Sequence, residues 1–322
     1  MEPPNQLNSC SSSSMPSVQD YFNGASIYVI PLAAVGAAFL MFSLLVFANT
    51  LRFILRRSCS KAKTFTTFIT AIYPVIGFLS YCFLLVPRSS LLCEALSQGF
   101  ITVALYQLFC LLMAYGGGHA SLIETAGSVR IDLKEPPCCC WPCCALPTFA
   151  LQKKAIDWFQ CLVLQVPLVQ GLVYFVFLLM WAENLSLYEA NYWYLQPVLI
   201  ISILTGIWGL TITIKALSSL LDPEFRLRTK LNILQGVLLF SKLQPLLIKV
   251  FVWTNLLPCN PPLTPQLYAN MIQSALLTME MALLGLLVRR IYRRQLPEVS
   301  SLKREPGANG PKLAGEDNPS YG

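Results

Sequence analysis

Seven long apolar stretches dominate this chain and restrict its fold more than any other feature. They are separated by short polar links and lie at about residues 27–51, 64–86, 98–115, 155–181, 194–221, 231–256 and 266–288. The hydrocarbon core of a bilayer is about 30 Å thick, and about 20 apolar residues in a helix cross it. Inside lipid, every backbone polar group of a single span needs a partner within that span, which a helix supplies. The sequence therefore predicts an all-α integral membrane protein with seven transmembrane helices.

The composition supports this fold class. Hydrophobic residues make up 55% of the 322 residues and charged residues only 12%, whereas soluble domains carry about 25% charged residues. The first stretch is too long for a cleaved signal peptide, and positive charge follows it rather than precedes it. We expect a disordered extracellular N-terminus at 1–26, a transmembrane domain at 27–288 and a cytosolic basic tail at 289–322. The tail string at 318–321, Asn-Pro-Ser-Tyr, favours a turn that endocytic adaptors could read, and a chance match is the alternative.

The basic residues predict an orientation. Cytoplasmic loops of membrane proteins collect Lys and Arg. The chain has 23 Lys and Arg residues. All of them except Arg88, Lys215, Lys242 and Lys249 lie in the links after stretches 1, 3 and 5 or in the C-terminal tail. This pattern places the N-terminus outside and the C-terminus in the cytosol. A glycosylation sequon beginning at Asn184 falls in a link that this layout places outside, so Asn184 is a candidate glycosylation site.

Five cysteines crowd into the predicted cytosolic loop at 116–154; they are Cys138, Cys139, Cys140, Cys143 and Cys144. Disulfides are disfavoured there because the cytosol keeps thiols reduced. Cys140 and Cys143 have the spacing of zinc ligands, but a structural zinc site normally takes two such pairs, and the chain has no second pair near the first. S-acylation fits better, because cysteines beside a membrane face and near basic residues such as Lys153 and Lys154 are typical palmitate acceptors. An unmodified loop is the remaining alternative, and we expect neither a metal nor a cofactor.

Ionisable residues inside spans are costly and are candidates for function. In the sixth stretch Gln235, Lys242 and Lys249 are seven residues apart, so they share one helix face. In the seventh stretch Gln273 and Glu280 show the same spacing. Lys242 and Glu280 lie at depths that would allow them to pair. Two interpretations follow: a structural ion pair that joins the two helices, or a cationic stripe that receives an anionic group.

Other features bear on the class of function. Arg88 lies at the predicted outer face, where Glu94 could be its rim partner, and Arg88 is a further candidate contact for an anion. No nucleophile–base constellation and no HExxH or GxSxG motif is present, so no enzyme activity and no catalytic residue is predicted. The triple glycine at 116–118 lacks a following Gly-Lys-Ser/Thr. It predicts a helix stop rather than a nucleotide site, and nothing indicates a nucleic-acid partner.

Several of these strings, in this order, resemble the alpha subunits of the organic solute transporter family. They are PPCCCWPCC after GGGH and before KK, Pro87-Arg88-Ser89, Leu243-Gln244-Pro245, Glu280, and RRIYRR at 289–294. The resemblance covers about residues 40–295, and Lys242 departs from it, because an uncharged residue is expected there. It implies a facilitative carrier for amphipathic steroid-like anions, such as bile acids and conjugated steroids. It also implies a single-span beta subunit and a position in the plasma membrane, basolateral in epithelia, after assembly in the endoplasmic reticulum.

Two alternatives share the seven spans. A seven-helix receptor would have the same orientation, but the link after the fourth stretch has no cysteine for a bridge to the third, and the seventh stretch has no Asn-Pro near its inner end. A trafficking or scaffold protein that moves no solute is the second alternative.

Overall fold

Seven long helices make up almost all of the part of the chain that the structure describes. The structure is a computed structural model, and it describes residues 17–57, 60–118, 122, 130–131, 149–150, 152–218, 220, 226–254, 256–257 and 264–294. The helices are α2 (Val18–Arg57), α3 (Ser60–Leu85), α4 (Ser90–Tyr115), α6 (Lys153–Glu183), α7 (Leu185–Ser218), α8 (Leu227–Trp253) and α9 (Pro265–Arg294). All seven are long and apolar enough to cross a membrane. The predicted all-α membrane fold with seven spans is therefore confirmed.

Three short elements lie between these helices in the described part of the chain. A 3-10 turn, η1 (Pro87–Ser89), joins α3 to α4. Strands β1 (Arg130–Ile131) and β2 (Phe149–Ala150) pair antiparallel within the loop between α4 and α6. The five cysteines of this loop and the 318–321 string lie outside the described residues.

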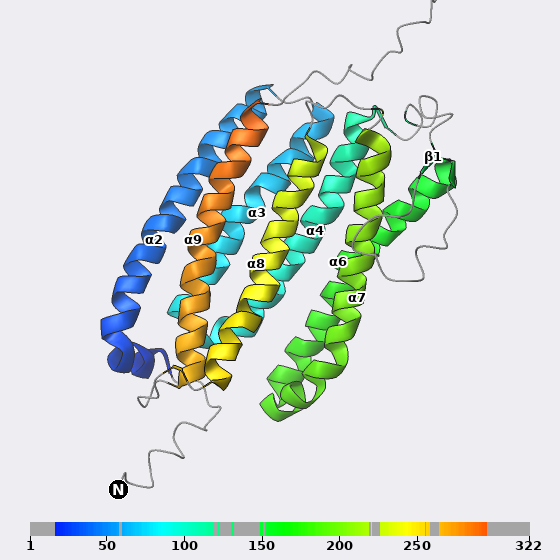
Figure 1. Ribbon diagram of the computed structural model, residues 1–322. Coiled ribbons are helices and arrows are strands. Elements are labelled where there is room, and N and C mark those ends of the chain that lie inside the picture. Colours follow the sequence, from blue (N-terminus) through cyan, green and yellow to red (C-terminus); the bar gives the residue numbers. More distant parts are fainter. Residues whose placement is uncertain are drawn as a thin grey trace, which may run out of the picture.

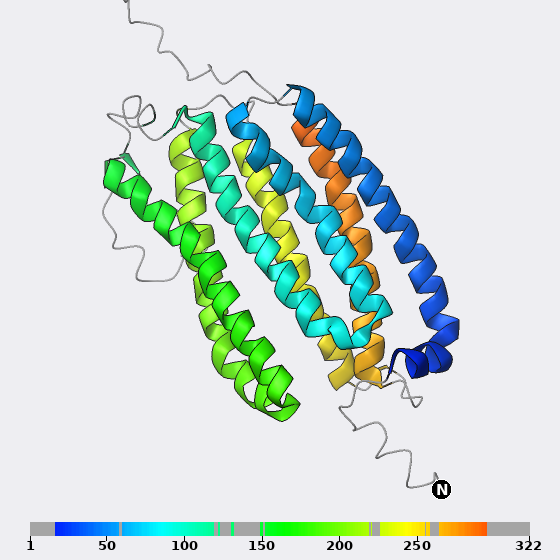
Figure 2. The same cartoon turned by 180° about the vertical axis from the view of Figure 1, so that it is seen from behind.

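The helices form an elongated bundle in which α6 and α7 occupy one side and α2 the other (Figure 1). Helices α3, α4 and α6 face the viewer in Figure 2, with α7, α8 and α9 behind them. Helix α2 packs against α3 and α9, and α6 packs mainly against α7 and α4. The turn between α6 and α7 lies at the same end of the bundle as the start of α2. We call it the Asn184 end; the predicted orientation places it outside the cell.

The helix limits differ from the sequence prediction at two places that matter. Helix α2 begins at Val18, because the Ser17 hydroxyl caps it by accepting a 3.2 Å hydrogen bond from the Asp20 N–H. Helix α4 begins at Ser90 rather than near residue 98, because Pro87 starts a tight turn directly before it. At its other end α4 stops at Tyr115, and the following glycines include two with positive φ, so the predicted helix stop is confirmed.

Helices α6 and α7 approach each other closely along a face of small residues. A Cβ placed on Gly206 would collide with the Val166 side chain, and one on Gly209 would lie 3.3 Å from Leu162 Cβ. Small residues let membrane helices approach closely where the hydrophobic effect does not drive association. Gln165 adds a hydrogen bond of 2.8 Å to the Thr205 hydroxyl on α7. The two helices therefore form a tightly packed hairpin, and side chains of both helices contribute to the site described next.

Candidate functional site

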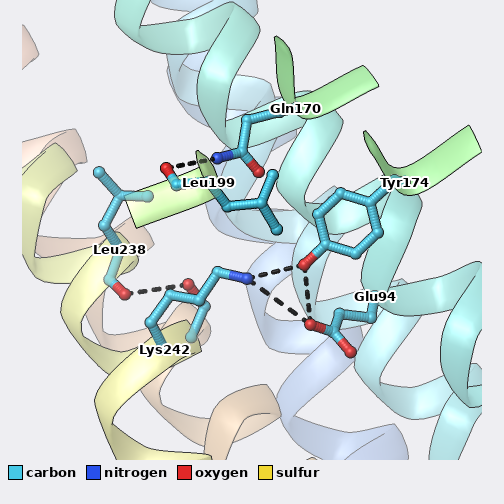
Figure 3. A network of polar contacts seen from close by, with 7 residues as sticks. Glu94, Gln170, Tyr174, Leu199, Leu238 and Lys242 are labelled. Carbon is cyan, nitrogen blue, oxygen red and sulfur yellow. Dashed lines mark hydrogen bonds and ion pairs between the residues drawn. The ribbon is translucent and has the colours of Figure 1, made fainter. Parts of the chain in front are cut away.

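Three polar side chains from three helices meet within the bundle (Figure 3). Lys242 of α8 donates a 2.7 Å hydrogen bond to the Tyr174 hydroxyl of α6. That hydroxyl in turn donates a 2.8 Å bond to Glu94 Oε1 of α4, and Lys242 Nζ lies 3.6 Å from the same oxygen. The three groups form a closed triangle, which we call the Lys242 cluster. A cation and a carboxylate placed among membrane helices are thus paired with each other, as such groups require.

Helix lengths place the Lys242 cluster below the surface of the bundle. Glu94 lies one turn into α4, whereas Tyr174 lies nine residues before the end of α6 at Glu183. At about 1.5 Å per residue, α6 therefore continues roughly 13 Å beyond the cluster. Figure 1 shows the same relationship, since the turn between α3 and α4 ends short of the α6–α7 and α8–α9 ends. The early start of α4 is what brings Glu94 to this depth.

The cluster is accessible despite its depth. The Lys242 side chain is 31% exposed and the Glu94 side chain 43% exposed, whereas Tyr174 is buried. Helices α7 and α8 touch each other only sparingly, and α8 presents a run of exposed apolar residues, Leu243, Leu246, Leu247, Val250 and Phe251. An amphipathic molecule could thus reach the charged pair along an apolar surface.

An aromatic cluster continues from Tyr174 toward the Asn184 end. Phe177 is fully buried and packs edge-on against Tyr174 and Tyr188, and it stacks on Tyr192 with ring centroids 5.6 Å apart. Lys249, two turns beyond Lys242 on α8, lies with Nζ 5.7 Å from the centroid of the Tyr192 ring. Such a distance is typical of a cation–π contact. This part of the bundle therefore combines two lysines with packed aromatic rings.

The contacts agree with the predicted shared face of α8 for Lys242 and Lys249, and they do not test Gln235. Lys242 and Lys249 both point toward the α6–α7 hairpin, and Gln235 lies partly buried further along α8. Arg88 lies in η1, exposed at the start of α4. Gln273 lies partly buried on α9, a helix that contributes no side chain to the Lys242 cluster.

Two expectations about charged side chains need correction. Lys242 pairs with Glu94 and not with Glu280; Glu280 instead accepts a 3.3 Å hydrogen bond from Gln244 Nε2. Lys230, expected in a cytosolic link, lies within α8, is 4% exposed and donates a 3.1 Å bond to the Tyr115 hydroxyl. The pairing of Glu94 with Arg88 at the outer rim stays a prediction.

Sequence reasoning missed two members of the Lys242 cluster. Glu94 carried a usable signal, since it is a carboxylate close to an apolar stretch, but its depth depends on where α4 begins. Tyr174 carried none, because a tyrosine in an apolar helix is normally a packing residue. Both become visible only when α4, α6 and α8 are placed together.

Asn184 is exposed and forms the whole link between α6 and α7. Its side-chain Oδ1 accepts hydrogen bonds of 3.0 Å from both the N–H and the hydroxyl of Ser186. The described residues include no group of three or more His, Cys, Asp or Glu that could hold a metal ion.

Comparison with known proteins adds a family to this geometry. Residues 32–296 match the family described as organic solute transporter Ostalpha. The chain is 24% identical over 303 residues to an organic solute transporter alpha-like protein of Drosophila melanogaster, covering 93% of this chain and 92% of that one. It is 27% identical over 275 residues to the organic solute transporter subunit alpha of Homo sapiens, covering 83% and 78%.

The zebrafish protein of the same name, from Danio rerio, is 22% identical over 272 residues, covering 82% of each chain. No solved structure matches the chain. The family is one of solute transporters and not an enzyme family. Seven apolar membrane-length helices and a family match over most of the sequence lead to one conclusion: this chain belongs to the organic solute transporter Ostalpha family of membrane solute transporters.

Proposed function

We propose that this protein is a facilitative carrier for amphipathic steroid-like organic anions, such as bile acids and conjugated steroids. The observation that carries the proposal is the accessible Lys242 cluster beside a cluster of packed aromatic rings. A steroid anion has a broad apolar body and one charged group, so it needs an apolar path with few cationic points. The described spans supply both features on adjacent helices.

The substrate step can be written in terms of these side chains. The anionic headgroup takes the place of Glu94 as the partner of Lys242, while the Tyr174 hydroxyl turns to donate to the incoming oxygen. Exchange of one anion for another keeps Lys242 paired throughout, and the partly exposed Glu94 carboxylate that it releases takes up a proton or turns to water. Lys249 offers a second cationic contact nearer the Asn184 end. Arg88, Gln235, Gln273 and Glu280 lie outside this triangle, and a role for them along the path is part of the same proposal.

The assembly and location belong to the proposal as well. Several relatives are named as alpha subunits, which supports a complex with a second, single-span beta subunit. We place the complex in the plasma membrane, basolateral in epithelia, with the N-terminus outside, after assembly in the endoplasmic reticulum. Membrane lipid surrounds the exposed apolar faces of α2, α7 and α8.

Uptake measurements test the proposal. Cells would express this chain alone or with a candidate single-span partner, and uptake of a radiolabelled sulfated steroid would be followed over time. We expect uptake only with the partner, saturable and independent of ATP. Lys242→Met should weaken apparent affinity by about 10-fold or more, the worth of a hydrogen bond to a charged group. Lys154→Met, at the exposed far end of α6, is the matched control and should leave uptake unchanged.

Surface biotinylation of each variant separates a transport defect from a trafficking defect. Uptake that stays flat in the presence of surface-expressed chain and partner would overturn the carrier proposal. Uptake that is unaffected by Lys242→Met would keep the carrier but remove the Lys242 cluster from its path.

A further inference from the structure

Glu280 is a carboxyl group in the middle of a membrane-spanning helix, on the other side of α8 from the Lys242 cluster. It lies about midway between the ends of α9 at Pro265 and Arg294. Its partner, Gln244, is two residues beyond Lys242, and two residues correspond to about 200° around a helix. The Glu280–Gln244 contact is therefore a separate feature between α8 and α9, and nothing in the proposed transport step uses its pairing.

The hydrogen bonds at this contact are incomplete in a specific way. Gln244 Nε2 donates to Glu280 Oε1 over 3.3 Å. The other two oxygens, Glu280 Oε2 and Gln244 Oε1, are both buried, and neither accepts a hydrogen bond from any residue that the structure describes. Two buried acceptors that belong to one hydrogen-bonded pair of side chains therefore lack a donor. Exchanging the nitrogen and oxygen of the Gln244 amide would not satisfy all the acceptors, because the amide oxygen would then face Glu280 Oε1.

The surrounding helices offer no cation to compensate an ionised Glu280. On each neighbouring helix, the ionisable side chains on either side of the level of Glu280 are few. They are Lys242 and Lys249 on α8, Tyr73, Tyr81 and Cys82 on α3, and Tyr268 and Arg289 on α9; α2 carries none between Tyr28 and Arg52. Lys242 is bound to Tyr174 and Glu94, and Lys249 lies over Tyr192. An ionised carboxylate without a cation at this depth would be strongly disfavoured.

One proton removes both difficulties at once. We propose that Glu280 is a proton-binding site, occupied at neutral pH, at which the protonated carboxyl and the Gln244 amide form a cyclic pair of two hydrogen bonds. The proton sits on Oε2, and this O–H donates to Gln244 Oε1, while Gln244 Nε2 donates to Glu280 Oε1. Both orphaned acceptors are then satisfied, and no net charge remains between α8 and α9.

The location gives the pair a structural consequence. Pro245 follows Gln244 directly and lies inside α8, where it removes the backbone donor to the carbonyl of Ser241. The cyclic pair therefore ties α8 to α9 beside the point at which α8 lacks a helical hydrogen bond. Removal of the proton would break one of the two bonds and leave a charge there, which would loosen this junction.

Infrared spectroscopy of the purified full chain in detergent tests the proposal directly, because only a protonated carboxyl shows the carbonyl stretch of an acid. At neutral pH we expect this band in the wild type and its loss in Glu280→Gln. Glutamine can form the same ring as an amide–amide pair, so this variant should keep its thermal stability. Glu183→Gln, at an exposed carboxyl at the end of α6, is the matched control and should retain the band. Identical spectra for wild type and Glu280→Gln would overturn the proposal.

Gln244→Leu supplies a second arm that does not depend on removing Glu280. Loss of the amide frees the acid carbonyl from its hydrogen bond, so the band should shift to higher frequency while keeping its intensity. A band that keeps its frequency in Gln244→Leu would show that the acid is not paired with this amide, which would contradict the cyclic arrangement.

Discussion

Lys242 Nζ lies 3.6 Å from Glu94 Oε1, although the two residues belong to different helices, α8 and α4. The Tyr174 hydroxyl of α6 bridges them, so the pair fixes three helices at one point. Because both charged side chains are partly exposed, a molecule that carries its own anion can compete for Lys242. This relationship links the packing of the bundle to the proposed passage of solutes.

A double-mutant cycle distinguishes Glu94 from Glu280 as the partner of Lys242. Thermal stability would be measured in detergent for Lys242→Met, Glu94→Gln and the double variant. We expect a coupling energy of about 1 kcal/mol, the upper part of the range for partly exposed ion pairs. The matched cycle of Lys242→Met with Glu280→Gln should be additive within about 0.5 kcal/mol. Larger coupling to Glu280 than to Glu94 would contradict the observed arrangement.

The α6–α7 hairpin should be sensitive to a single methyl group at Gly206. Gly206→Ala would force its Cβ into Val166, whose β-branched side chain has few alternative rotamers. Overpacking of this kind costs about 1–3 kcal/mol, so the melting temperature should fall. Gly171→Ala on α6 is the control, because nothing lies within 4 Å of that Cβ position, and alanine there should match or raise the stability. Equal melting temperatures for both variants would show that the hairpin is looser than described.

Asn184 tests the predicted orientation. Helix α6 has 31 residues, or about 46 Å at 1.5 Å per residue. That length exceeds the roughly 30 Å hydrocarbon core, so the sequon at the end of α6 can clear the membrane. We expect a glycosidase-sensitive gel shift that is lost in Asn184→Gln and kept in Asn191→Gln, a change outside any sequon. Reactivity of a C-terminal epitope on intact cells would contradict the layout, whether or not glycan is found.

S-acylation of the loop at 116–154 remains a prediction from the sequence alone. An acyl-exchange assay should label the wild type and lose most of its signal when Cys138, Cys139, Cys140, Cys143 and Cys144 are changed to serine. Each buried methylene of an acyl chain contributes about 0.8 kcal/mol of membrane affinity, so two or more chains would hold this loop at the membrane. Cys161→Ser, at an exposed cysteine within α6, should leave the signal intact. Absence of label in the wild type would favour the zinc interpretation.

The apolar stretches were sufficient to predict seven helices, because lipid leaves a single span no other way to satisfy its backbone. The seven-residue spacing likewise predicted that Lys242 and Lys249 share a face. The partner of Lys242 could not be predicted, since it depends on which helices become neighbours and on how deep each one begins. Glu94 illustrates the difficulty: the turn at Pro87 starts α4 early, so this residue belongs to the helix, where it reaches Lys242 of α8. Lys230 shows the same difficulty at the other end of the bundle, because the tyrosines that contact it come from two different helices, α4 and α9.

Counterflow in proteoliposomes tests the central claim, facilitative exchange of a steroid-like anion at Lys242, most directly. Vesicles containing the chain and its single-span partner would be preloaded with unlabelled sulfated steroid, and the entry of a trace of labelled steroid would be followed without ATP or ion gradients. We predict a transient accumulation of label above equilibrium, reduced at least several-fold by Lys242→Met and preserved in Lys154→Met. Label that enters no faster in preloaded vesicles than in empty ones, or that enters equally fast in protein-free vesicles, would contradict the account.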